Sequence, residues 1–154
     1  MIKFTTNEKN LATVLAGKPL KLTKLVKIAL RRTWREIGKD LKDEATKAIL
    51  SSKSGKHYTT GSRSGGRRRR HVASAPGESH SDVSGALRRS LDWKVNGWDS
   101  LDFGYLYRPP DYAHSVEFGD PPDLKPRPTL LNAIKAQQGN IERQFASNMR
   151  DELG

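Results

Sequence analysis

The chain has 154 residues, of which only 34% are hydrophobic, and it carries a formal net charge of +11 at pH 7. The length favours one domain over residues 1–154, and the excess of cations favours an anionic partner, either nucleic acid or an acidic protein surface. The absence of cysteine excludes disulfides and thiolate metal sites. With no apolar stretch of the ~20 residues that a membrane helix needs, a soluble protein without a membrane partner is expected.

Residues 1–20 are expected to form an N-terminal arm. Ile2 and Phe4 alternate with polar residues, which predicts a short strand, and "NLATVLAG" is a candidate helical turn closed by Gly17.

A long helix is predicted next, with Thr23 as a candidate cap. Apolar residues at spacings of three and four indicate one stripe on a helix of roughly 27 residues, whose simplest role is core packing. The stripe consists of Leu22, Leu25, Val26, Ala29, Leu30, Trp34, Ile37, Leu41, Ala45 and Ile49. The other face carries the cations Lys24, Lys27, Arg31, Arg32, Arg35 and Lys39.

Residues 51–79 form the most basic stretch, since no acidic residue lies between Glu44 and Glu78. Their composition predicts a flexible loop that is too polar to bury anything. The candidate nucleic-acid-binding residues are Lys53, Lys56, Arg63, Arg67, Arg68, Arg69 and Arg70. Such cations would contact phosphates without reading sequence, or would grip an acidic face of a neighbouring protein. No aromatic residue is interleaved with the arginines, so base stacking is not expected.

From Asp82 onward the pattern becomes regular. Asp82 is a candidate cap for the short turn "VSGALRRS". The segments "LDWKVN" and "LDFGYLY" alternate apolar and polar residues, which predicts a β-hairpin. One apolar face would contain Leu91, Trp93 and Val95, and another Leu101, Phe103, Tyr105 and Tyr107.

The last third of the chain is expected to hold a short amphipathic piece, "YAHSVEFGD", and a final helix opened by Pro128. The apolar face of that helix would contain Leu130, Leu131, Ile134, Ile141, Phe145 and Met149. Residues 80–154 thus supply the hairpin, the YAHSVEFG segment and the C-terminal helix. The expected fold is α+β, with a long N-terminal helix and a C-terminal helix packed on a small antiparallel sheet, plus a long basic loop.

No catalytic, metal or cofactor site is expected. Asp111 after Pro110, followed by Asp123 and Lys125, matches a loose pattern of metal-dependent nucleases. The prolines around the second acid forbid the central strand on which those enzymes place it. The histidines have no regular ligand spacing; they are His57, His71, His80 and His114.

The order "SAPGE…SGALRRSLDWKV…YAHSVEFGD…KPRPTLLNAI" resembles the tailed-phage neck and tail-completion proteins of the HK97 gp10-like family over roughly residues 72–135. A P2-type virion morphogenesis family has a similar layout. Thr129 stands where the family usually has an aromatic residue.

The resemblance implies a structural, non-enzymatic virion protein. It would form a homo-oligomeric ring, expected to be a hexamer, at the head–tail junction or tail top of a tailed bacteriophage. It would complete the tail and join it to the head, with neighbouring neck and tail proteins and the phage double-stranded DNA as partners. Its location would be the virion, and the host cytoplasm during assembly. The alternative is a stand-alone nucleic-acid-binding protein without sequence specificity.

The residues expected to serve assembly are those of the matching motifs: Arg88, Tyr112, Ala113, Glu117, Phe118, Gly119, Pro126 and Pro128. Tyr112, Val116 and Phe118 would pack on the sheet, while Ala113 permits close approach. Gly119 would take a positive φ, and the prolines would stiffen the entry to the last helix. Glu117 would either pair with an arginine such as Arg88, within or between subunits, or lie exposed to solvent.

Overall fold

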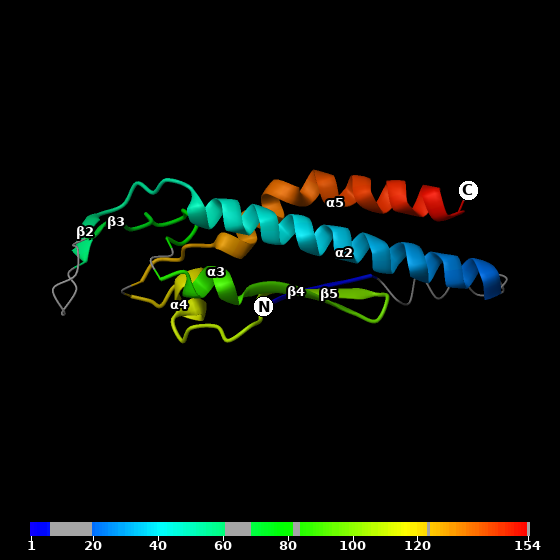
Figure 1. Ribbon diagram of the computed structural model, residues 1–154, viewed down its shortest axis with the longest axis horizontal. Helices are drawn as coiled ribbons and strands as arrows, with labels where there is room; N and C mark the ends of the chain where they lie inside the picture. The colour runs from blue at the N-terminus through cyan, green and yellow to red at the C-terminus, as the bar shows by residue number, and fades with distance from the viewer. Residues whose placement is uncertain (7–19, 61–68, 82–83, 123, 154) are drawn as a thin grey trace.

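The computed structural model describes residues 1–6, 20–60, 69–81, 84–122 and 124–153. In chain order the elements are β1 (Ile2–Thr5), α2 (Leu20–Leu50), β2 (His57–Thr60), β3 (Arg69–Val72), α3 (Ala86–Ser90), β4 (Leu91–Asn96), β5 (Ser100–Tyr105), α4 (Ala113–Phe118) and α5 (Thr129–Leu153). The two long helices pack with a small antiparallel sheet, which confirms the α+β class (Figure 1). No helix within the described ranges has the length and apolar character needed to cross a membrane.

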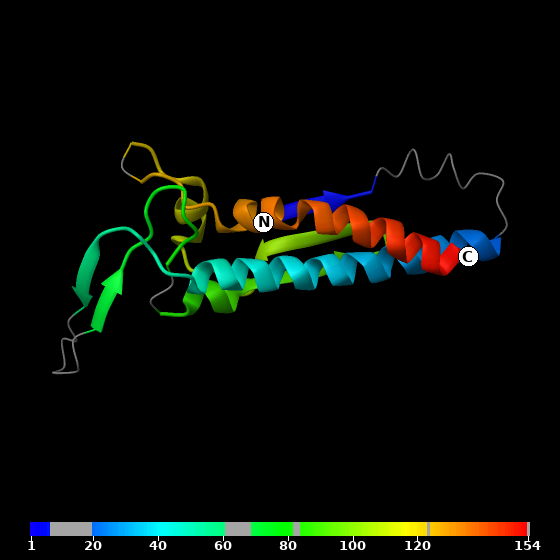
Figure 2. The same ribbon diagram turned by 90° about the horizontal axis from the view of Figure 1, so that it is seen from above.

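The main sheet has the strand order β1-β5-β4, so the predicted hairpin is present and the N-terminal strand completes it. Trp93 lies opposite Phe103, and Ile2 lies opposite Phe103 on the other side. Because residues directly opposite each other share a face, the apolar positions of the two hairpin strands form one face rather than two. This face joins α2 and α5 in one core, and the helices run side by side in opposite directions (Figures 1 and 2).

The long helix α2 begins at Leu20, so Thr23 lies inside its first turns and does not cap it. The apolar stripe is confirmed from Val26 to Ile49, whereas Leu22 and Leu25 are only half-buried. Gly38 faces the sheet, where a Cβ atom would lie 2.6 Å from the ring of Trp93. The missing side chain therefore lets the helix backbone approach β4 closely.

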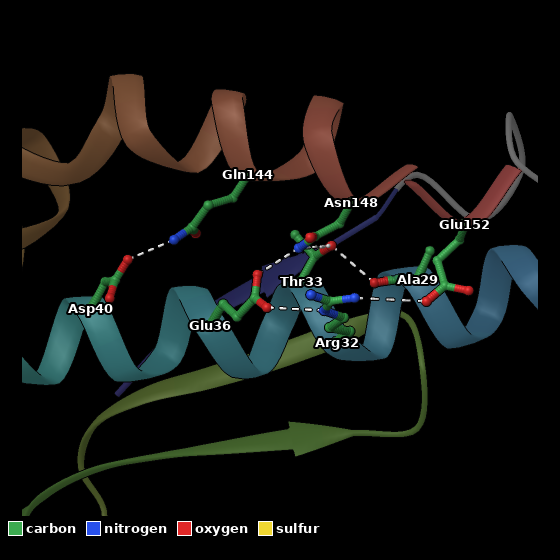
Figure 3. Close-up of polar contacts among 8 residues, drawn as sticks. All are labelled: Ala29, Arg32, Thr33, Glu36, Asp40, Gln144, Asn148 and Glu152. Atoms are coloured by element: carbon green, nitrogen blue, oxygen red, sulfur yellow. Dashed lines mark hydrogen bonds and ion pairs between the residues drawn. The ribbon is translucent and has the colours of Figure 1, made fainter. Parts of the chain in front are cut away.

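Polar contacts join α2 to α5 along a second seam (Figure 3). The buried Asn148 side chain donates to Thr33 Oγ1 over 3.2 Å and to Glu36 Oε2 over 2.5 Å. One helical turn away, Gln144 donates to Asp40 Oδ2 over 2.6 Å. Buried groups with defined partners favour one alignment of the two helices, because sliding α5 would leave them unsatisfied.

The helix α5 starts at Thr129, and the Pro128 carbonyl accepts the Asn132 N–H over 3.1 Å, so Pro128 opens the helix as expected. Leu131 is 44% exposed and does not belong to the apolar face on which it was predicted. Leu130 is fully buried.

The prediction of an irregular loop over residues 51–79 is wrong for two segments. His57–Thr60 and Arg69–Val72 pair as the antiparallel hairpin β2–β3, which projects beyond the end of α2 (Figure 2). Ser74 and Ser79 are buried, so the stretch also contributes to packing. The predicted turn "NLATVLAG" and the Asp82 cap lie outside the described residues.

Candidate functional site

The YAHSVEFG segment folds as α4 followed by a sharp stop at Gly119. Gly119 has φ 81° and ψ 168°, which confirms the expected positive φ. A Cβ atom there would lie 2.8 Å from the carbonyl oxygen of Leu124. Asp120 and Leu124 exchange two backbone hydrogen bonds, of 2.8 and 2.9 Å, that close the following loop. Glycine is therefore required for conformation and for space.

The "KPRP" segment returns along α4 before the last helix begins. Arg127 N–H donates to the Val116 carbonyl over 2.8 Å, and the Arg127 side chain donates to the Ser74 carbonyl over 3.0 Å. The Pro126 carbonyl accepts the Gly77 N–H over 3.1 Å. These bonds tie α4, the entry to α5 and the chain after β3 into one unit.

Glu117 caps the last helix, although it lies twelve residues before it. Oε1 accepts the N–H of Leu130 over 2.8 Å, with a longer contact of 3.4 Å to Leu131. Oε2 accepts the N–H of Thr129 over 3.0 Å and the Tyr105 hydroxyl over 3.2 Å. The carboxylate thus meets the first backbone donors of α5 at the positive end of the helix, and it shares the Thr129 N–H with the Arg127 carbonyl, which lies at 2.9 Å.

This role corrects the expectation for Glu117. The residue is only 3% exposed, so the solvent-exposed alternative is wrong. Within the chain its donors come from α5 and β5, while Arg88 lies exposed on α3, and pairing with an arginine between subunits stays a prediction.

The protonation of Glu117 reflects two opposed effects. Burial raises the pKa of the carboxyl above 4.5, while the hydrogen bonds from Leu130, Leu131, Tyr105 and Thr129 act to lower it. Burial is the larger effect because a charge loses hydration that a few donors replace only in part.

Thr129 helps to dock the start of the last helix. The residue is fully buried, and its hydroxyl oxygen accepts the His80 N–H over 2.9 Å. A hydrogen bond to the segment before α3 therefore fixes the start of α5.

Two aromatic residues of the segment lie at the surface. Tyr112 is 42% and Phe118 is 53% exposed, so the prediction that they pack on the sheet is wrong, whereas Ala113 and Val116 are buried as expected. Phe118 contacts the His114 ring at 4.8 Å between centroids. It borders a pocket of about 290 Å³ that Tyr105, Pro110 and Glu117 also line.

The predicted nucleic-acid-binding residues have different surroundings. Lys56 and Arg70 are exposed near and on the β2–β3 hairpin, and Arg69 pairs with Thr60 in its ladder. Arg63, Arg67 and Arg68 lie outside the described residues. Among the described residues of this set, the side chains of Lys56 and Arg70 are exposed, and the strand register separates them by three positions along the hairpin.

Lys53 is a structural residue rather than a free cation. Its ammonium donates to the Ala48 carbonyl over 2.5 Å and to Ser51 Oγ over 3.0 Å, at the C-terminal end of α2. Burial lowers the pKa of Lys53, and the nearby Glu78 carboxylate partly opposes this change. The position suits a cation because the free carbonyls at a helix end carry partial negative charge.

Two features of the hairpin were not predicted. Glu78 anchors its base by accepting Ser54 Oγ over 2.6 Å and Ala75 N–H over 2.8 Å, and these hydrogen bonds lower the pKa of its carboxyl. Tyr58 is 52% exposed and lies in β2 opposite His71, the residue that follows Arg70 in β3. The pairing thus places Tyr58 one ladder position from Arg70, although the two residues are far apart in the sequence.

No group of three or more His, Cys, Asp or Glu side chains in the described part of the chain is arranged to hold a metal ion. Comparison with models of known families, with curated proteins and with solved structures finds no match to this chain.

Proposed function

We propose that the chain is a structural subunit of a ring at the head–tail junction or tail top of a tailed bacteriophage. Such a ring completes the tail and joins it to the head. The sequence resemblance motivates this function, and the geometry of the YAHSVEFG segment supports it.

The observation that carries the proposal is the exposed aromatic surface of that segment. Phe118 is half exposed beside a pocket in a chain that is poor in hydrophobic residues. Exposed aromatic residues next to a concavity are typical of protein interfaces. The helix that carries Phe118 is held rigidly by the Glu117 cap and the Gly119 turn, so little side-chain and backbone order needs to be gained on association.

The β2–β3 hairpin would extend from this body toward a partner. Its exposed Lys56 and Arg70, with the neighbouring arginines, suit either phage DNA or an acidic face of a neck or tail protein. Replacing Arg67–Arg70 by serine in a phage separates the two. With DNA as the partner, heads and tails still join but hold or release DNA poorly; with a protein face, joining itself fails.

Assembly is tested by sedimentation velocity and negative-stain microscopy of the purified chain. The wild type is expected to form closed oligomers as concentration rises. Phe118→Ser should stay monomeric with an unchanged circular dichroism spectrum, because the side chain is exposed. Tyr58→Ser is the matched control, since Tyr58 is equally exposed but lies on the hairpin. A wild-type chain that remains monomeric, or a Phe118→Ser variant that assembles normally, contradicts the proposal.

A further inference from the structure

A second basic surface lies on the first half of α2, at the opposite end of the molecule from β2–β3 (Figure 1). It is a groove of about 570 Å³ between α2 and the β4–β5 turn. Its walls include four exposed cations, an exposed isoleucine and a tryptophan: Lys24, Lys27, Arg31, Arg35, Ile28 and Trp98.

The tryptophan reaches the helix only through the tertiary fold. Trp98 lies in the turn between β4 and β5, and the Lys27 ammonium sits 5.2 Å from the centroid of its ring. Arg31 Nε donates to the Gly97 carbonyl over 3.1 Å, which fixes the turn against α2. An aromatic surface is therefore held among the cations.

Four of the five cations that line the groove have no neutralising partner among the described residues. The fifth, Arg32, pairs with Glu36 at 3.1 Å and Glu152 at 3.9 Å (Figure 3). Within the described residues, Lys24, Lys27, Arg31 and Arg35 make no ion pair with a carboxylate. Like charges four residues apart destabilise a helix, so this face is adapted to an external anion more than to stability.

The arrangement of these charges is linear. The steps from Lys27 to Arg31 and from Arg31 to Arg35 are four residues each, which is about 6 Å along the helix axis per step. A row of this kind fits a chain of regularly spaced anions better than a single small anion, which would reach one or two of the cations. A second copy of this chain is disfavoured as the occupant because its net charge is also +11.

We infer that this groove binds a single-stranded segment of nucleic acid. Phosphates lie along the row of cations, and one base stacks on the Trp98 ring. A basic groove combined with an aromatic surface is the arrangement that single-strand binding uses, since every base offers a flat face. A duplex keeps its bases stacked inside, so Trp98 would add little to duplex binding.

The test is fluorescence anisotropy with a labelled 12-nucleotide oligothymidylate, with tryptophan emission recorded in parallel. Trp98→Ala should weaken binding about 5- to 150-fold, as expected for losing one stacked base. Trp98→Phe should retain the affinity but lose the emission change, because Trp34 is buried and Trp93 packs on α2. Raising the salt should lower log K with a slope of about −3 if four phosphates are contacted.

Charge reversal provides the matched control. Arg31→Glu with Arg35→Glu should abolish measurable binding, while Arg143→Glu with Arg150→Glu, an equal change in net charge on exposed positions of α5, should change it less than about threefold. The variant Lys56→Glu with Arg70→Glu measures any contribution from the hairpin.

Two results would overturn the inference. One is equal binding of the oligothymidylate and a 12-base-pair duplex with no effect of Trp98→Ala, which indicates a phosphate-only surface. The other is equal or tighter binding of a 12-residue polyglutamate peptide, which indicates an acidic protein partner. The inference goes beyond the ring proposal and does not depend on it, because the oligomeric state is measured separately by sedimentation.

Discussion

Replacing Glu117 by alanine removes the acceptor that the start of α5 requires. The N–H of the fully buried Leu130 would then lose the acceptor that Glu117 provides, whereas the Thr129 N–H keeps the Arg127 carbonyl at 2.9 Å. The variant is therefore expected to lose stability through the junction between α4 and α5, and not through loss of an apolar contact.

The magnitude follows from the number of donors left unpaired. One buried donor, the Leu130 N–H, loses its acceptor, and an unsatisfied buried donor costs about 1–3 kcal/mol. Part of this loss is offset, because the variant no longer has to bury the Glu117 carboxylate, whose pKa is raised by burial. We expect a net loss of about 1–2 kcal/mol, which corresponds to a fall in Tm of about 2–8 °C for a domain of this size.

Thermal and urea unfolding followed by circular dichroism measure this loss. Glu142→Ala is the matched control, because Glu142 is an exposed residue of α5, and its effect should stay within about 0.5 kcal/mol. A Glu117→Ala variant that loses no more than the control, about 0.5 kcal/mol, would refute the capping role.

The pH dependence of the stability of Glu117→Gln gives an independent check of the direction in which the Glu117 pKa is shifted. A carboxyl with a raised pKa stabilises the fold fully below its unfolded value of 4.5, and that contribution is lost as pH rises through the folded value. The stability of the wild type relative to Glu117→Gln should therefore increase as pH falls from 7 toward 4.5. The opposite trend would show that hydrogen bonding outweighs burial.

Three further variants test other parts of the structure. For Glu78→Gln, the stability of the wild type relative to the variant should decrease as pH falls. Hydrogen bonds lower the Glu78 pKa from 4.5, so the stabilising effect of this carboxylate is lost as the protein is acidified below that value. Unfolding measured over a range of pH tests this trend. Gly119→Val should cost about 3 kcal/mol or more through its positive φ and the overlap with Leu124, and should reduce the yield of folded protein. Asn148→Leu should cost about 1–3 kcal/mol in urea unfolding, because Thr33 and Glu36 lose a buried donor.

Matched controls are available for two of these variants. Gly77→Ala tests positive φ without overlap, since no atom lies within 4 Å of the added Cβ, and should be milder than Gly119→Val. Gln138→Leu introduces the same side chain as Asn148→Leu at an exposed position of α5 and should be nearly neutral. For Glu78→Gln, a stability difference from the wild type that is independent of pH would contradict the assigned hydrogen bonds.

Local sequence patterns determined most elements of the main body. Apolar residues that recur about every 3.6 positions identified the helices α2 and α5, and apolar residues at every second position identified the hairpin strands. The buried face of a helix or strand repeats with these periods. The stop at Gly119 was also predictable, since a glycine after a short amphipathic run marks a positive φ. The β2–β3 hairpin was missed because its strands are polar, and their pairing leaves no apolar alternation to detect.

The functional surfaces depended on the tertiary structure. Glu117 caps a helix that begins twelve residues later, and Trp98 joins cations that lie more than sixty residues before it. No local pattern encodes such meetings, because they follow from how the loop after Gly119 returns and from how α2 packs on β4. Sequence alone gave the sign and density of the charge on this protein. The fold decided which cations bind other groups of the chain, since Lys53 donates to the Ala48 carbonyl at the end of α2. It also decided which cations face solvent beside the Trp98 ring.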